Sequence, residues 1–150
     1  MITVKNILDK KGNEIFSISP DKTVFEALKI LADKDIGALM VMQDDQLLGI
    51  FSERDYARKL ILKGFFSKDT KVADVMSKEL VVISPETEIF KCMQLMTEKK
   101  IRHLPIVDNT KVIGIVSIGD IVNTIIHSQE VVINDLEGYI KGGGYGAFWK

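Results

Sequence analysis

The sequence is poor in the residues that cross-link or interrupt a chain, since it has one cysteine and three prolines among 150 residues. The single cysteine, Cys92, excludes an internal disulfide, and with only two histidines in the chain a zinc site is short of ligands. Cys92 lies within IFKCMQLM, where apolar residues recur at helical spacing. We therefore expect Cys92 to pack in the core.

Long apolar runs are also missing, and no stretch approaches the roughly 20 residues that a membrane helix needs. The opening MITVKNILDKKG has no apolar segment behind a basic head, so we expect no secretory signal and a cytoplasmic location. The net charge is −1 and the lysines are scattered, whereas a nucleic-acid surface needs a basic patch. We expect neither a membrane nor a nucleic acid as partner.

The strongest pattern in the sequence is an internal repeat. A shift of about 65 residues aligns residues 18–62 with residues 83–127 without a gap, and about a dozen positions are identical. GIFSERD (residues 49–55) returns in this way as GIVSIGD (residues 114–120), with the glycine, the serine and the aspartate kept. The chain is a tandem duplication with the composition of a globular protein, 46% apolar and 27% charged.

Each copy predicts the order strand, helix, strand, strand, helix. In the first copy NEIFSIS alternates as a strand, and TVFEALKILADK has helical spacing with a capping box formed by Thr23 and Glu26. GALMVM and QLLGIFS read as a hairpin, and ERDYARKLIL returns to helical spacing. Such a small unit does not cover its apolar faces alone. We expect an α/β (α+β) protein whose two copies pack sheet to sheet with pseudo-twofold symmetry and two equivalent clefts.

The expected boundaries are 4–65 for the first repeat, 72–128 for the second, 129–141 for a C-terminal helix and 142–150 for a flexible tail. The C-terminal helix is predicted because Val132, Leu136 and Ile140 recur at helical spacing, on a face that suits the module or a second subunit. The tail has three successive glycines followed by aromatic residues. It is either an end without fixed structure or an aromatic hook for a neighbour or partner.

Four segments, IRHLPIVD, GIVSIGDIV, IGALMVM and GIFSERDYAR, together with the repeat, resemble tandem cystathionine-beta-synthase (CBS) domains, the pair called a Bateman module. The resemblance covers about residues 4–126 and is nearest to small stand-alone bacterial two-CBS proteins that end in a helix similar to INDLEGYI. It implies a homodimer that binds adenosine-containing ligands such as AMP, ATP, NAD(H) or, less favoured, S-adenosylmethionine. It also implies a regulatory role without catalysis or catalytic cofactor, acting on an effector protein that the sequence does not identify.

The duplicated Ser-x-x-Asp motif, at the change from strand to helix, has two interpretations. A serine followed three residues later by an aspartate is a capping arrangement for free backbone N–H groups. The resemblance instead implies that Asp55 and Asp120 bind ribose hydroxyls, while Ser52 and Ser117 contact phosphate or ribose. A helix N-terminus also favours phosphate. We predict binding at one cleft or both, with the cap present in the empty state.

The resemblance also assigns walls to each cleft. It places the adenine at the start of the second strand of each repeat and the ribose near the end of the first strand. These positions are Ile36, Gly37, Ala38, Ile101, Arg102, His103 and Leu104 for the adenine, and Ser17 and Val82 for the ribose. Val82 stands where the family often has threonine, so a hydroxyl contact is in doubt at that cleft.

The two copies differ in charge, which predicts unequal affinities. Arg54 and Arg58, beside the first motif, either bind phosphate or lie on a solvated helix face. Arg102 and His103 serve either their own cleft or the neighbouring one, and His103 also suits a packed structural role.

We predict a nucleotide sensor over two alternatives. The first is a structural or oligomerising module whose clefts are empty or hold a metal ion. The second is a hydrolase that uses Ser52 or Ser117 with a histidine, but no Gly-x-Ser-x-Gly turn occurs and no histidine is duplicated with the serines.

Overall fold

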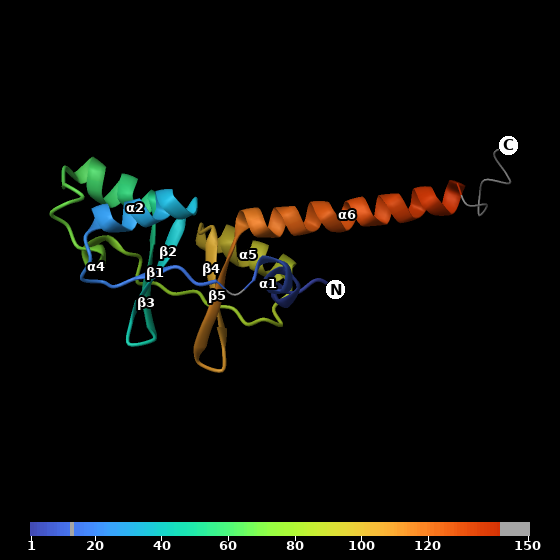
Figure 1. Ribbon diagram of the computed structural model, residues 1–150, viewed down its shortest axis with the longest axis horizontal. Coiled ribbons are helices and arrows are strands. Elements are labelled where there is room, and N and C mark those ends of the chain that lie inside the picture. The colour runs from blue at the N-terminus through green and yellow to red at the C-terminus, as the bar shows by residue number, and fades with distance from the viewer. Residues whose placement is uncertain (13, 142–150) are drawn as a thin grey trace.

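A computed structural model describes residues 1–12 and 14–141 of the chain (Figure 1). The tail expected at 142–150, with its aromatic hook, lies outside the described residues. None of the helices in the described ranges combines the length and the apolar character that crossing a membrane requires. The mixed α and β fold class predicted from the sequence is confirmed, with two sheets and a C-terminal helix.

The first half of the chain follows the predicted order of elements. Its elements are α1 (Val4–Lys11), β1 (Ser17–Ile18), α2 (Val24–Lys34), β2 (Ala38–Gln43), β3 (Gln46–Ser52), α3 (Glu53–Asp55), the π-helix η1 (Tyr56–Leu60) and the 3-10 helix η2 (Ile61–Lys63). The predicted capping box begins α2, since Thr23 Oγ1 accepts from the Glu26 amide at 3.2 Å and Glu26 Oε2 accepts from the Thr23 amide at 2.9 Å. The helix predicted after β3 therefore forms, but it changes from α to π and 3-10 geometry.

The second half differs from this order at its first strand and at its last helix. The strand predicted before the first long helix of the second copy does not form within the described residues, and Ile83 makes only an isolated parallel bridge with Ile106 where the first copy has β1. The elements of the second half are α4 (Val72–Val75), α5 (Ile89–Lys99), β4 (His103–Asp108), β5 (Lys111–Ser117) and α6 (Ile118–Lys141). The last helix of the second repeat and the expected C-terminal helix are one uninterrupted helix of 24 residues. Its beginning packs on the body through buried Ile121, and every residue from 129 to 141 is exposed as the helix leaves the body (Figure 1).

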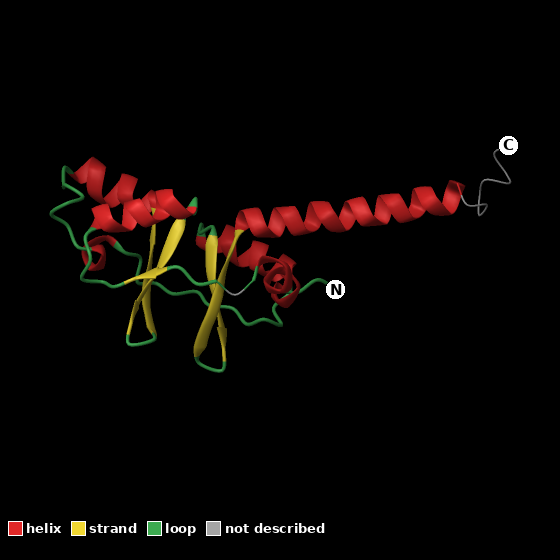
Figure 2. Ribbon diagram, viewed as in Figure 1, coloured by secondary structure: helices red, strands yellow, loops and turns green. Residues whose placement is uncertain are grey.

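The sheets reproduce the repeat in their register. In the first sheet β1 runs parallel to β2 and β2 antiparallel to β3, while β4 and β5 form the second antiparallel hairpin (Figure 2). Ala38 pairs with Ser52, and His103 pairs with Ser117 at the equivalent place. The start of each second strand thus lies beside the serine of the motif, as the site prediction requires.

The buried residues divide into two clusters, and each cluster takes a helix from the other half of the sequence. Val4, Ile7 and Leu8 of α1 lie in the core of the second repeat, whereas Val72 and Val75 of α4 lie in the core of the first. Backbone hydrogen bonds fix both helices in these places, among them Val4 N to Thr87 O at 2.9 Å and Val72 N to Lys22 O at 2.8 Å. The short helix that precedes each repeat therefore joins the two repeats into one body.

Candidate functional site

Both Ser-x-x-Asp motifs form the capping arrangement. Ser52 Oγ accepts from the Asp55 amide at 3.2 Å, and Asp55 Oδ2 accepts from the Ser52 amide at 2.9 Å. The Ser117 hydroxyl and the Asp120 carboxylate make the same pair of bonds, at 3.1 and 2.9 Å. Each motif thus satisfies the first amide groups of the helix after the hairpin. The capping interpretation holds in both copies, and any ligand-binding role comes in addition to it.

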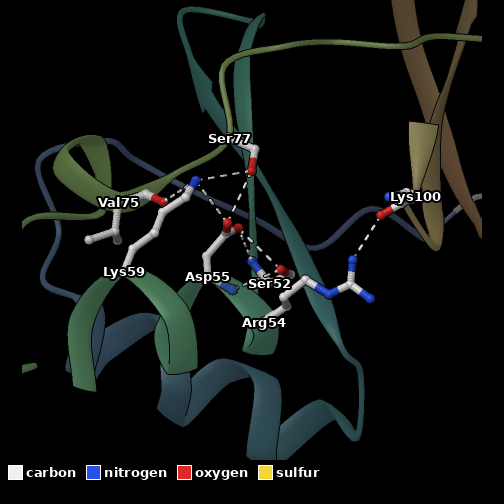
Figure 3. A network of polar contacts seen from close by, with 7 residues as sticks. All are labelled: Ser52, Arg54, Asp55, Lys59, Val75, Ser77 and Lys100. Atoms are coloured by element: carbon white, nitrogen blue, oxygen red, sulfur yellow. Dashed lines mark hydrogen bonds and ion pairs between the residues drawn. The ribbon is translucent and has the colours of Figure 1, made fainter. Parts of the chain in front are cut away.

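Asp55 has further partners that tie the motif to the connection between the repeats (Figure 3). Its Oδ1 accepts from Ser77 Oγ at 3.0 Å and pairs with Lys59 Nζ at 3.0 Å. Lys59 Nζ also donates to the carbonyl of Val75 at 3.2 Å. Both carboxylate oxygens are therefore engaged, and Asp55 is only 5% exposed. The same network holds Ser77 to α3, and backbone hydrogen bonds with Ile50 hold it to β3.

A cavity of about 400 Å³ opens beside this network. Its walls come from the first motif, from the connection at 77–81 and from the start of β4, so both repeats contribute. Of the residues predicted for a site, it is lined by Gly37, Ser52, Arg54, Asp55, Ile101, Arg102 and His103. Arg102 and His103 thus line the cleft of the other copy's motif, which is the second of the two alternatives left open by the sequence.

The cavity gathers positive charge from both repeats. Its lining cations are Arg54, Arg58, Lys59, Lys100 and Arg102, against the acidic Glu53, Asp55 and Glu79. Arg54 donates from its guanidinium to the carbonyl of Lys100 at 2.8 Å, at the end of α5 (Figure 3). Arg54 therefore links the first motif to the second repeat and is not simply on a solvated face.

Part of the cavity wall is not predicted by the sequence. Lys59, Ser77 and Lys100 line the cavity, and none of them belongs to the predicted site. The i,i+4 spacing of Asp55 and Lys59 on one helix is a signal that was available. Ser77 has no comparable signal, because its contact with Asp55 spans 22 residues of sequence.

His103 lies where the two halves meet. A Cβ placed on Gly37 would lie 3.5 Å from Cε1 and Nε2 of the His103 ring. Burial lowers the pKa of His103, Lys11 and Arg102 lower it further, and Asp120 opposes them. The imidazole is therefore held toward its neutral form unless an anion enters the cavity.

Asp120 faces a different surrounding from Asp55. Its Oδ2 accepts from Lys11 Nζ of α1 at 2.7 Å, and its side chain is 24% exposed. Burial raises the pKa of Asp120, but hydrogen bonds from Lys11 and Ser117 outweigh this and hold its pKa below the ordinary range. A shallow hollow beside it is formed by α1 and α6 and includes His127. The equivalent motifs therefore have unlike neighbours.

The remaining predicted positions do not line the main cavity. Leu104 is fully buried in the second core, and Ala38 is buried at the start of β2. Ile36 packs against the first core, Ser17 is exposed on β1, and Val82 is 47% exposed. Their ligand roles stay predictions.

Comparison with known proteins gives a consistent result. The family model described as CBS domain matches residues 1–62 and 72–127. The mitochondrial CBS domain-containing protein CBSX3 of Arabidopsis thaliana is 39% identical over 150 residues, covering 94% of this chain and 73% of the relative. CBS domain-containing protein YhcV of Bacillus subtilis is 33% identical over 118 residues, covering 79% of this chain and 84% of the relative.

Solved structures show the same likeness. The crystal structure of the CBS domain protein NE2398 has a TM-score of 0.80 and 43% identity, covering 83% of this chain and 98% of that one. The CBS-domain containing protein ATU1752 from Agrobacterium tumefaciens has a TM-score of 0.79 and 35% identity, covering 82% of this chain and 98% of that one.

Proposed function

The chain belongs to the CBS domain family, and from this premise we propose that it binds an adenosine-containing ligand in the cavity beside Ser52 and Asp55. CBS domain pairs are commonly regulatory modules, and the proposed role is regulatory binding without catalysis. AMP, ATP and NAD(H) are the proposed ligands. S-adenosylmethionine is less favoured, because its sulfonium is itself a cation and the cavity is lined by cations.

The observation that carries the proposal is the cation cluster contributed by both repeats to one cavity. The side chains of Arg58 and Arg102 make no hydrogen bond or ion pair with the rest of the described chain, although both line the cavity. Guanidinium groups bind phosphate oxygens in bidentate geometry and stay charged at physiological pH. The size of the cavity also fits the usual range for small-molecule sites.

Binding of the ribose at Asp55 requires an exchange of partners. Asp55 Oδ1 already accepts from Ser77 and pairs with Lys59. A ribose hydroxyl takes the place of one of these groups, which frees Lys59 for phosphate or loosens the Ser77 segment from the first motif. A ligand then favours one arrangement of the two repeats over another, because it has different affinity for the two arrangements.

The competing function is a structural module, and the same carboxylate favours it. An Asp55 whose oxygens are occupied by Ser52, Ser77 and Lys59 has a sufficient structural reason to be present. In that case the cations of the cavity serve only to join the repeats, as the Arg54 guanidinium does with Lys100.

A ligand panel with two variants separates the functions. AMP, ATP, NAD, NADH and S-adenosylmethionine are each added at about 100 times a trial Kd, where binding adds roughly 2.7 kcal/mol and raises Tm by several degrees. Arg58→Ala and Arg102→Ala each weaken binding at least tenfold in calorimetry. Lys111→Ala removes an equal charge at an exposed position outside the cavity wall and leaves binding within twofold. If no ligand shifts Tm, the structural function replaces the proposal.

Two further measurements address the remaining parts of the proposal. Nucleotide incubated with the purified protein stays intact, since a regulatory site does not turn its ligand over, and released product would favour the hydrolase.

The homodimer implied by the family is tested by sedimentation. The apolar surface proposed for this contact on the module consists of the exposed Ile61, Leu62, Phe65 and Phe66. The cytoplasmic location and the effector protein stay predictions, for fractionation and pull-down.

A further inference from the structure

Val132, Ile133 and Leu136, on the exposed part of α6, belong to an apolar stripe that the described residues of the body leave uncovered. Successive residues of a helix are about 100° apart, which places the large apolar residues of α6, except Val131, within an arc of roughly 140°. Ile121 in this arc is fully buried in the second core, whereas Val132, Ile133 and Leu136 are each more than half exposed. The stripe therefore continues past the body that covers its first turns (Figure 1).

The stripe contains a heptad pattern. Its a positions are Ile126, Ile133 and Ile140, and its d positions are Val122, Gln129 and Leu136. Isoleucine at a with leucine at d favours two parallel strands in a coiled coil. No charged residue occupies an a or d position of this segment. The pattern is typical of a helix that pairs with an identical helix in a coiled coil.

Gln129 points to self-association in parallel. In a parallel pair of identical helices, the two Gln129 side chains meet in one layer, where each amide has a donor and an acceptor for the other. In an antiparallel pair Gln129 lies opposite an apolar residue. Antiparallel pairing also brings Glu130 and Glu137 of the two copies to one flank, where like charges repel.

The polar side of α6 argues against a membrane as the occupant. Helices that lie on membranes carry lysine and arginine on their polar face. Between residues 129 and 140 the charged residues are Glu130, Asp135 and Glu137, with no cation. An anionic lipid surface repels such a helix.

The body leaves room for a partner along this seam. The side of α6 that faces the second core, through Ile121 and Ile125, lies roughly 80° around the helix from the a and d seam. Val122 and Ile126 begin the seam at 41% and 48% exposure. A partner helix on the seam therefore meets α6 without displacing the core contacts. We propose that the seam of α6, from Val122 to Ile140, pairs in parallel with α6 of a second copy of this chain.

The test compares two glutamate substitutions on the exposed helix. Ile133→Glu places a charge at an a position, while Val131→Glu, at a residue 44% exposed on the opposite side of the seam, is the matched control. Sedimentation equilibrium runs at roughly 100 μM, where a complex of micromolar Kd is formed. Both substitutions are made in a Phe66→Ser background, so that the apolar surface of the module does not hold two copies together by itself. We expect Ile133→Glu to halve the mass of the Phe66→Ser protein and Val131→Glu to leave it unchanged. A Phe66→Ser protein whose mass is the same with and without Ile133→Glu, or that sediments as one chain, overturns the proposal.

Two more variants fix the surface and the direction. Ile133→Glu in the native background leaves the apolar surface of the module intact, so its mass shows whether that surface holds two copies without the pairing of α6. Gln129→Cys is expected to form a disulfide between copies on mild oxidation, because parallel d positions are adjacent. The native Cys92 is fully buried and does not compete. A dimer without this cross-link overturns the parallel arrangement.

Discussion

Replacing Gly49 by alanine tests how the first motif is held to the connection between the repeats. A Cβ at Gly49 would lie 2.7 Å from the carbonyl oxygen of Ser77 and 2.9 Å from Met76 Sδ. The Ser77 carbonyl accepts from the Ile50 amide at 3.0 Å, and the Ser77 amide donates to Ile50 O at 2.8 Å. This backbone does not move aside without losing both bonds. The close approach that glycine permits here is therefore to the protein's own chain.

The cost follows from these contacts. Overpacking typically costs about 1–3 kcal/mol, and each hydrogen bond lost costs about 0.5–1.5 kcal/mol. Alanine recovers about 0.5–1 kcal/mol relative to glycine within a strand. We expect the free energy of unfolding to fall by about 3 kcal/mol, which lowers Tm by roughly 6–12 °C for a chain of this length.

Gly114 provides the matched control, because it is the same position in the second copy. Its added Cβ meets Leu8 Cδ2 at 3.0 Å, the end of a flexible side chain, and then Ile106 Cδ1 at an ordinary 3.6 Å. Gly114→Ala is expected to stay within about 0.5 kcal/mol of the parent. Urea denaturation followed by circular dichroism gives both values. A Gly114→Ala protein as unstable as Gly49→Ala, or a Gly49→Ala protein equal to the parent, refutes this account of the Ser77 contact.

Three further predictions concern titratable groups. His103 has a pKa below its ordinary 6.5, so its contribution to stability is complete above pH 6.5 and is lost as the pH falls through the lowered pKa. In the His103→Gln protein, the free energy of unfolding should therefore depend less on pH between about pH 7 and 5 than in the parent. Asp120, also with a lowered pKa, stabilises above its ordinary 3.8 and loses this effect in acid, and Lys11→Met should raise that pKa in an NMR titration; an unmoved pKa would deny the pairing. Burial raises the pKa of Cys92 to about 11, so a thiol reagent at about pH 8 should react only as fast as the protein unfolds.

Local signals explain what the sequence predicts correctly. The capping boxes at Thr23, Ser52 and Ser117 depend on residues three apart, so their partners are visible in the sequence. The hairpins follow from apolar runs around short turns, and the repeat doubles each signal. The contact between Ser52 and Asp55 could therefore be predicted from the sequence alone, without knowledge of the tertiary structure.

Contacts between distant segments explain what the sequence does not predict. The placement of α1 in the second core and α4 in the first depends on backbone bonds such as Val72 N to Lys22 O, which leave no periodic pattern. The same holds for Ser77 on Asp55. The continuity of α6 is different, because no glycine or proline lies between Asp120 and Glu137, and helical spacing runs through the expected boundary at 128.

The structure connects the cavity to the helix proposed to join two copies. Arg102 lines the cavity with its side chain, while its carbonyl accepts from the amide of Ile118 at 2.9 Å, in the first turn of α6. In the first copy the equivalent bond runs from Glu53 N to Gly37 O at 3.2 Å, and the helix that follows ends after a few turns. The two repeats thus share the motif and this backbone bond, but only the helix of the second repeat extends beyond the body. Under the proposed function, we expect a ligand phosphate bound by Arg102 to act on the start of α6 through this backbone bond. By thermodynamic linkage, if ligand binding strengthens the pairing of α6 by some factor, the pairing strengthens ligand binding by the same factor.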